Sequence, residues 1–390
     1  MVTKLSLHEL PPLSLYVHLP WCVRKCPYCD FNSYTAGEDA PRERYLAALL
    51  QDLESEARRA NGRELISVFL GGGTPSLFSP RQIGALLDQV AASFTLAGNA
   101  EITMEANPGT VECGDPAGYR KAGVNRLSIG AQSFSSESLQ LLGRIHSVAD
   151  IERSVAEARV NFDNINVDIM YALPGQTVSA AIHDIEQASR LEANHLSWYQ
   201  LTLEPNTIFY ARPPDDLPDE DTTWEIQEQG QALLAEHGYR QYEVSAHAKE
   251  DRACKHNLNY WLFGDYLAIG AGAHGKITSA QGIARFVKPA NPLQYMNMVE
   301  ARGEIPAPVM VERADLAFEF MLNALRLTAG FAESDFCERT GQTAAELHAV
   351  MRPAVDKGLV LRENESVWRA TRLGRRFLND LQAEFLPDRP

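Results

Sequence analysis

Strand-like and helix-like segments alternate six times between residues 13 and 203, and this alternation constrains the fold more than any other feature. Each apolar run with the length of a strand is followed by a segment whose apolar residues recur at helical spacing. Such alternation predicts an α/β fold in which right-handed crossovers curl a parallel sheet into a full or partial (β/α) barrel. The predicted strands are 13–19, 65–70, 101–106, 126–132, 165–173 and 195–203.

The pattern changes near residue 300, where helical segments and then a small hairpin replace the alternation. A chain of 390 residues is long for one domain and suits a large domain with a small one. We therefore predict a barrel domain over 1–300 and a small helical, winged-helix-like domain over 301–390. Its predicted elements are helices at 312–327, 334–340, 344–357 and 371–383 and strands at 359–362 and 367–370.

Three cysteines follow the first predicted strand with the spacing C-x3-C-x2-C, at Cys22, Cys26 and Cys29. Thiolates are the ligands that iron–sulfur clusters require, and soft sulfur disfavours magnesium or calcium. A cubane cluster has four irons, so three cysteines would leave one iron open to a non-protein ligand.

Two other interpretations of these cysteines remain open at this point. A structural zinc site closes with four ligands, commonly from paired C-x2-C units, and the chain has no second such pair. A disulfide needs only two thiols and an oxidising compartment. The remaining cysteines, Cys113, Cys254 and Cys337, are scattered and indicate reduced thiols in a cytosol.

Glycines and carboxylates follow later strands, at the ends where barrel enzymes place their sites. The run Gly71, Gly72 and Gly73 lets backbone approach a charged head group without a Cβ clash, although tight turns use glycine equally. Glu105 and Asp168 end the third and fifth strands inside apolar segments, where an unpaired carboxylate is costly. A salt bridge or a helix cap would also account for each carboxylate.

Taken together, the ordered motifs resemble the radical S-adenosylmethionine (SAM) superfamily, whose signature is a C-x3-C-x2-C loop after the first barrel strand. The run from Tyr16 to Cys22, Y-V-H-L-P-W-C, is similar to the oxygen-independent coproporphyrinogen III oxidase group. The resemblance covers residues 13 to about 280. It implies a [4Fe–4S] cluster on the three cysteines and reductive cleavage of SAM to methionine and a 5′-deoxyadenosyl radical.

The resemblance also implies roles for side chains across neighbouring strand ends. Arg144 would pair its guanidinium fork with the SAM carboxylate, and Gln132 would lie near the ribose. Tyr16 would contact the methionyl end and Tyr28 the adenine, although aromatic residues there pack more often than they bind. The implied SAM residues are Tyr16, Tyr28, Gly72, Gly73, Thr74, Glu105, Gln132, Arg144 and Asp168.

The chain departs from the oxidase pattern at Phe31, where true oxidases carry a fourth cysteine. Its segment before Tyr16 is also shorter than the N-terminal arm of those oxidases. It carries instead an H-N-x-x-Y-W run from His256 to Trp261, which resembles the HemW branch, regarded as haem chaperones. A neutral histidine is a common haem-iron ligand and aromatic rings can stack on a porphyrin. His256 is therefore a candidate haem ligand, against the alternative of a histidine capping a helix over an aromatic core.

Two functions follow as expectations: a haem chaperone that holds a cluster and SAM and delivers haem to acceptor proteins such as respiratory haemoproteins, or a coproporphyrinogen III oxidase. Either would need an electron donor. There are 51 acidic residues against 36 basic ones, which gives a net charge of −15. This charge repels nucleic-acid phosphates and disfavours a third alternative, an RNA-modifying enzyme, although a local basic patch could still exist. We expect a cytoplasmic protein, with dimerisation and peripheral membrane contact left open.

Overall fold

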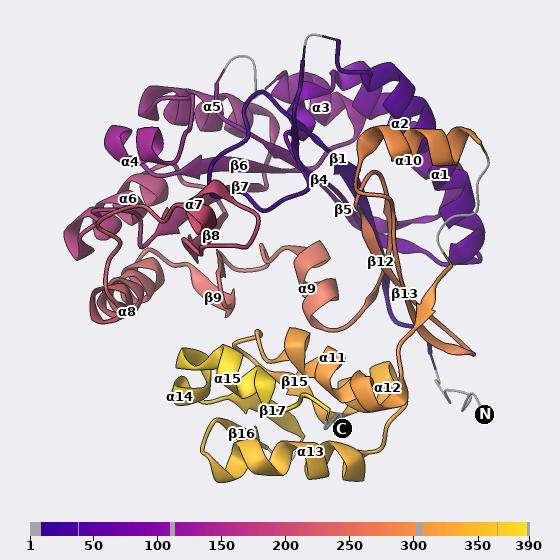
Figure 1. Ribbon diagram of the computed structural model, residues 1–390, viewed down its shortest axis with the longest axis vertical. Helices are drawn as coiled ribbons and strands as arrows, with labels where there is room; N and C mark the ends of the chain where they lie inside the picture. The colour runs from indigo at the N-terminus through magenta and orange to yellow at the C-terminus, as the bar shows by residue number, and fades with distance from the viewer. Residues whose placement is uncertain (1–8, 38, 110–113, 302–306, 365, 388–390) are drawn as a thin grey trace.

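A single twelve-stranded sheet, curved like an arch, forms the large part of the molecule (Figure 1). The computed structural model describes residues 9–37, 39–109, 114–301, 307–364 and 366–387. The sheet runs in the order β14-β13-β12-β11-β1-β4-β5-β6-β7-β8-β10-β9, so its described strands form an open, partial barrel. Its parallel strands are β11 (Asp265–Ile269), β1 (Leu13–Leu19), β4 (Leu65–Gly72), β5 (Leu96–Ala106), β6 (Arg126–Gln132), β7 (Ile165–Tyr171) and β8 (His195–Gln200).

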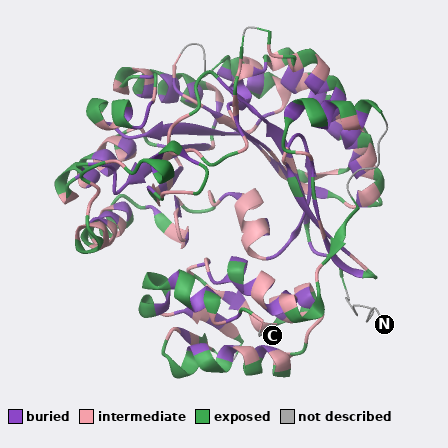
Figure 2. Ribbon diagram, viewed as in Figure 1, coloured by how far each residue is buried: buried purple, intermediate pink, exposed green. Residues whose placement is uncertain are grey.

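Except for the first half of β5, the parallel strands are largely buried, as nearly continuous apolar runs require. Every residue of β6 is buried, and Figure 2 shows buried residues along the arch with exposed ones on the outer faces of its helices. None of the helices that the structure describes is long and apolar enough to cross a bilayer. The covering helices are α1 (Arg42–Ala60), η1 (Pro75–Leu77), α2 (Pro80–Ser93), α3 (Pro116–Ala122), α4 (Ser136–Leu141), α5 (Val148–Asn161), α6 (Val178–Arg190), α7 (Ile208–Ala211) and α8 (Glu220–Glu236).

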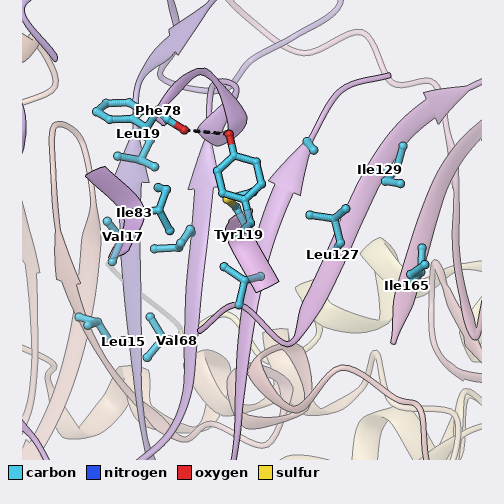
Figure 3. Packing of buried hydrophobic residues seen from close by; sticks show 14 of the residues in the cluster. Leu15, Val17, Leu19, Val68, Phe78, Ile83, Tyr119, Leu127, Ile129 and Ile165 are labelled. Atoms are coloured by element: carbon cyan, nitrogen blue, oxygen red, sulfur yellow. Dashed lines mark hydrogen bonds between the residues drawn. The ribbon is translucent and has the colours of Figure 1, made fainter. Parts of the chain in front are cut away.

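The core packs strand side chains against the helices, as Figure 3 shows around β1 and β4. The Tyr119 hydroxyl of α3 donates to the backbone oxygens of Ser76 and Phe78, each at 2.8 Å. These bonds fix the turn that follows the end of β4. The sequence prediction omitted α3, although Asp115 caps its start and Pro116 occupies its first turn.

The flanks of the sheet are antiparallel and differ from the prediction. The sequence also suggests one further strand over 239–246, but the structure has a break after Glu243. The segment forms the hairpin β9 (Arg240–Glu243) and β10 (Ala246–Ala248), with β10 antiparallel to β8. On the other side an unpredicted ribbon of β12 (His274–Ser279) and β13 (Gly282–Val287) extends the sheet from β11. The remaining elements here are β2 (Trp21–Cys22), β3 (Tyr34–Thr35), α9 (Lys255–Trp261), α10 (Pro292–Glu300) and β14 (Val309–Met310).

The C-terminal module is built around a second hydrophobic core, to which Phe263 and Ile283 of the large domain also belong. Its three-stranded sheet has the order β15-β17-β16, in agreement with the expected winged-helix-like hairpin. The helix predicted at 371–383 is broken at Phe377, where the backbone leaves helical geometry (φ −113°, ψ 49°). The predicted boundary at 300 falls at the end of α10, while β14 still pairs with β13. The module consists of η2 (Arg313–Asp315), α11 (Leu316–Ala324), β15 (Phe331–Ala332), α12 (Glu333–Thr340), α13 (Ala344–Asp356), β16 (Val360–Glu363), β17 (Val367–Ala370), α14 (Arg372–Arg376) and α15 (Leu378–Ala383).

Candidate functional site

A cavity of about 470 Å³ lies at the carboxyl ends of the parallel strands. Because strand ends of a parallel sheet meet at one edge, residues far apart in the chain converge there. The cavity brings together most of the predicted site residues. These are Cys22, Cys26, Tyr28, Cys29, Gly72, Gly73, Thr74, Glu105, Gln132, Arg144 and Asp168.

The three cysteines line this first cavity: Cys22 ends β2, and Cys26 and Cys29 lie on the loop that follows it. Burial raises the pKa of the Cys22 thiol to about 11 and raises that of Cys29, so a metal would have to displace their protons. Among the described residues, no three His, Cys, Asp or Glu side chains converge on a point that could hold one metal ion. The chain offers three sulfur donors here, one fewer than the four ligands that usually close a structural zinc site.

The glycine run at the end of β4 packs closely against the cysteine-bearing segment. Gly72 has φ +118°, and a Cβ there would lie 2.6 Å from the His18 ring. A Cβ on Gly73 would lie 2.6 Å from the backbone oxygen of Trp21. The glycines thus meet a packing requirement before any ligand is considered, and their backbone forms part of the cavity wall.

The two predicted carboxylates face the same space and form no ion pair with the described residues. Glu105 accepts from the backbone N–H of Gly72 at 3.1 Å. Burial, with the nearby charge of Asp168, raises the pKa of Glu105 to about 7. Asp168 accepts from Ser128 Oγ at 3.1 Å and Asn166 Nδ2 at 2.7 Å, and burial raises its pKa as well. Glu105 and Asp168 therefore form neither a salt bridge nor a helix cap with the described residues. Their carboxylate oxygens could accept hydrogen bonds from a bound polar ligand.

Arg144 connects the strand ends to the cysteine loop. Its Nη2 donates to Asn107 Oδ1 at 2.6 Å and to the backbone oxygen of Gly130 at 3.0 Å, and Nη1 lies 3.6 Å from Cys26 Sγ. Gln132 sits in a left-handed conformation (φ +70°) that is uncommon outside glycine and accepts from the Tyr199 hydroxyl at 2.7 Å. Such backbone strain is frequent where a side chain must be aimed at a site.

Asn107 and Tyr199 are among the residues of this cavity that sequence reasoning missed. Asn107 Nδ2 donates to Thr74 Oγ1 at 3.0 Å, so its amide links the glycine segment to Arg144. Asn107 follows directly after β5, and this position at a strand end was the available signal. Tyr199 lies inside β8 and carried no comparable signal.

A second cavity of about 540 Å³ adjoins the first and shares Gly72, Glu105, Asp30 and Phe31 with it. Tyr16, predicted to contact SAM, lines this second cavity and not the first. Phe31 is an exposed apolar side chain at 56% relative accessibility, on the border between the two spaces. The other lining residues are His18, Asn32, Phe69, His256, Asn257, Tyr260, Tyr266, Gly272 and His274.

His256, on α9, lines the second cavity and has one ring nitrogen without a hydrogen bond to the described residues. Its Nδ1 lies 3.0 Å from Ser67 Oγ, which itself donates to Ser14 Oγ at 2.8 Å. The Ser67 oxygen therefore accepts from Nδ1–H, and the lone pair remains on Nε2, which has no hydrogen bond to the described residues. Burial lowers the pKa of His256 to about 4, so the imidazole is neutral near pH 7.

The rest of the H-N-x-x-Y-W run holds α9 in place. Asn259 Nδ2 donates to Ser14 Oγ and to the backbone oxygen of Asp265, each at 2.9 Å. The ring of Tyr260 lies 4.8 Å from that of Tyr266, and the Trp261 ring lies 4.4 Å from the Arg326 guanidinium of the C-terminal module. The motif thus forms a cavity wall on one side of α9 and a junction between domains on the other.

Comparison with known proteins places this geometry in a family. The radical SAM superfamily model matches residues 16–188, and the HemN C-terminal domain model matches residues 311–377. The chain is 47% identical over 387 residues to "Heme chaperone HemW" of Haemophilus influenzae, covering 97% of this chain and 99% of that protein. The chain belongs to the HemW family. Membership of the radical SAM superfamily implies a [4Fe–4S] cluster and SAM as cofactors, for which the sulfur wall and polar groups of the first cavity are suited.

Other relatives agree with this placement. "Heme chaperone HemW" of Escherichia coli is also 47% identical over 387 residues, covering 97% of this chain and all of that protein (100%). Among solved structures, coproporphyrinogen III oxidase (HemN) from Escherichia coli has a TM-score of 0.81 at 25% identity, with 98% of this chain and 92% of that chain covered. The expected radical SAM fold with a small C-terminal domain is therefore confirmed.

Proposed function

We propose that this protein is a haem chaperone, which binds haem in the second cavity and passes it to acceptor haemoproteins. Two relatives that match nearly the whole chain at 47% identity carry the name heme chaperone. The observation that carries the proposal is the neutral His256, whose Nε2 lone pair is left for the cavity by the Ser67 contact. A neutral imidazole is the form that ligates haem iron.

The walls of the second cavity suit a flat, largely apolar macrocycle. Aromatic side chains from β1, β4, α9 and β11 line it, namely Tyr16, Phe69, Tyr260 and Tyr266. Ring faces can stack on a porphyrin, and a cavity of about 540 Å³ is of the size that holds a cofactor. We assign Tyr16 to the proposed haem site in the second cavity and not to SAM, because the centroids of the Tyr16 and His256 rings are 6.4 Å apart.

In the first cavity we assign Cys22, Cys26 and Cys29 as ligands of the [4Fe–4S] cluster. The other residues would bind SAM: Arg144 its carboxylate, the backbone of Gly72 and Gly73 its amino group. The remaining proposed SAM contacts are Tyr28, Thr74, Glu105, Gln132 and Asp168. When bound, the cluster would supply a single electron to SAM, and the protein residues would position the two cofactors and limit water access.

Coproporphyrinogen III oxidase is the alternative function, and the fold does not separate the two, since the oxidase from Escherichia coli has a similar structure. Phe31 favours the chaperone. Its apolar side chain stands exposed on the border of the two cavities, where the oxidase pattern has a fourth cysteine. The five cysteines that the structure describes are free thiols, which supports a cytoplasmic, reducing location.

The test is a pair of variants on anaerobically reconstituted protein. Changing Cys22, Cys26 and Cys29 to alanine should abolish bound iron and sulfide, about four of each per chain in the parent by cluster stoichiometry. His256→Ala should instead shift or weaken the haem Soret band while leaving iron and sulfide unchanged. His237→Ala, an exposed histidine on the surface after α8, is the matched control and should change neither.

Retention of the full Soret spectrum in His256→Ala would remove His256 as the ligand. Failure of the parent protein to bind haem, or formation of protoporphyrinogen IX from coproporphyrinogen III with SAM and a reductant, would overturn the chaperone function in favour of the oxidase.

A further inference from the structure

A third cavity, of about 360 Å³, lies where the C-terminal module meets α8 of the large domain. Arg372 of α14 forms an ion pair with Glu228 of α8. The β9–β10 hairpin and the segment after α11 also contribute residues. The cavity is therefore built by both domains and is separate from the two cavities described above, with which it shares no lining residue.

The lining is strongly basic in a chain whose net charge is −15. Four arginines line it, Arg326, Arg372, Arg375 and Arg376, against the carboxylate of Glu228; when Glu243, which pairs with Arg326, is also counted, the excess is two positive charges. Arg372, Arg375 and Arg376 are exposed, so water and salt screen their mutual repulsion, but an anion that entered the cavity would be attracted by all four guanidinium groups. The basic cavity thus indicates an anionic ligand.

Most of these guanidinium groups are held in place by contacts within the protein. Arg376 stacks on the Trp224 ring at 4.3 Å, and Arg326 stacks on Trp261 at 4.4 Å while donating to Glu243 at 3.1 Å. Stacking occupies the face of a guanidinium and leaves N–H groups at its edge for an acceptor. Arg375 has no ion pair or side-chain hydrogen bond with the described residues, so its five donors are available to a ligand.

The remaining lining is polar. Gln227 and Gln231 stand one turn apart on α8, whereas the Thr328 hydroxyl of the module already donates to the backbone oxygen of Gln241 at 2.7 Å. The glutamine amides can donate to phosphate oxygens, and the apolar lining is limited to Ala232 and Val244 beside the Trp224 ring. This composition suits a small, highly charged oxyanion better than an apolar molecule.

We propose that this cavity is a binding site for a phosphate group carrying more than one negative charge. Arginine forks match phosphate geometry with paired N–H···O bonds. The bound phosphate group would belong either to a soluble phosphorylated molecule or to the headgroup of an anionic lipid, because both present the same chemistry. Because both domains supply donors, the ligand joins the module to the large domain. This site stands independently of haem or SAM binding.

The first arm of the test uses inorganic pyrophosphate and the full-length protein. Calorimetry at physiological ionic strength should give saturable binding, and the thermal midpoint should rise with pyrophosphate concentration. Arg375→Ala should weaken binding roughly tenfold or more, since it removes charge-assisted hydrogen bonds. The matched control is Arg352→Ala, which removes an exposed arginine of α13 outside the cavity and should leave the affinity unchanged.

The second arm uses vesicles of phosphatidylcholine with and without phosphatidic acid. Binding to the acidic vesicles that is lost in Arg375→Ala and kept in Arg352→Ala, with weak pyrophosphate binding, identifies a lipid headgroup as the source. Saturable pyrophosphate binding without vesicle binding identifies a soluble one. The proposal is overturned if the parent protein binds neither probe, or if Arg375→Ala and Arg352→Ala behave alike.

Discussion

Arg144 is the residue that most directly couples the cysteine loop to the strand ends, through Cys26, Asn107 and Gly130. If it binds the SAM carboxylate, Arg144→Ala should weaken SAM binding by about 1.5–3 kcal/mol, the range for a hydrogen bond to a charged group. Arg144→Lys keeps the charge but loses the guanidinium fork, so its affinity for SAM should lie between those of the parent protein and Arg144→Ala. Calorimetry on cluster-loaded protein measures this, and equal affinity in all three proteins would contradict the assignment.

Glu105 should make stability depend on pH. Its pKa in the folded protein is raised to about 7, so between its ordinary value and pH 7 the folded state binds more protons than the unfolded one. The free energy of unfolding of the cofactor-free protein should therefore fall as pH rises through this window. Glu105→Gln keeps an acceptor for Gly72 N–H and cannot ionise.

Relative to the parent protein, the unfolding free energy of Glu105→Gln should rise by about 2 kcal/mol between pH 5 and pH 7. Urea denaturation at each pH measures this difference. A constant difference between the two proteins across this range would show that Glu105 does not retain its proton in the folded state.

At the scale of elements, a buried ion-pair cluster fixes the chain after β13 to helix α1. Lys288 Nζ lies 2.7 Å from Asp52 Oδ1 and 2.8 Å from Glu56 Oε1, and all three side chains are fully buried. Lys288→Ala would leave two carboxylates in a dry interior and should cost about 3–5 kcal/mol of unfolding free energy.

The matched control joins nearly the same elements at the surface. Arg44 of α1 pairs with Glu300 of α10 at 2.6 Å, with 39% and 45% of the side chains exposed. Arg44→Ala should cost no more than about 1 kcal/mol, because solvent screens the pair. Chemical denaturation compares the two variants, and similar losses would mean that burial does not govern these ion pairs.

At the scale of the whole molecule, the two domains share a core through the loop after α9. Phe263 is 1% exposed, belongs to the core of the C-terminal module and has its ring 5.7 Å from that of Phe320. Phe263→Ala should cost about 3–5 kcal/mol. Amide exchange in α11 and α12 should accelerate, although the substituted residue lies in the large domain.

The exposed Phe377, at 44% accessibility, provides the control: Phe377→Ala should leave this exchange nearly unchanged. Protection of α11 and α12 that survived Phe263→Ala would show that the module is stable without the shared core.

The meeting of several predicted residues at one edge could be expected from the sequence, because each strand could be located by its apolar run and parallel strands end at one edge, although Asn107 and Tyr199 were missed. Cys22, Glu105, Gln132 and Asp168 converge for that reason, and only Tyr16 lies on the neighbouring cavity. The C-terminal hairpin was predictable on similar local grounds. The division at residue 300 stays a prediction.

Only the tertiary structure decided what surrounds His256. Its ring meets Ser67, 189 residues earlier in the chain, and the unpredicted β12–β13 ribbon closes the same side of the sheet. Likewise, Arg376 reaches Trp224 only because the C-terminal module docks on α8. Periodicity reports which face of a segment is buried but not the partner that buries it, so docking between distant segments, and the second and third cavities that depend on it, could not be derived from local pattern.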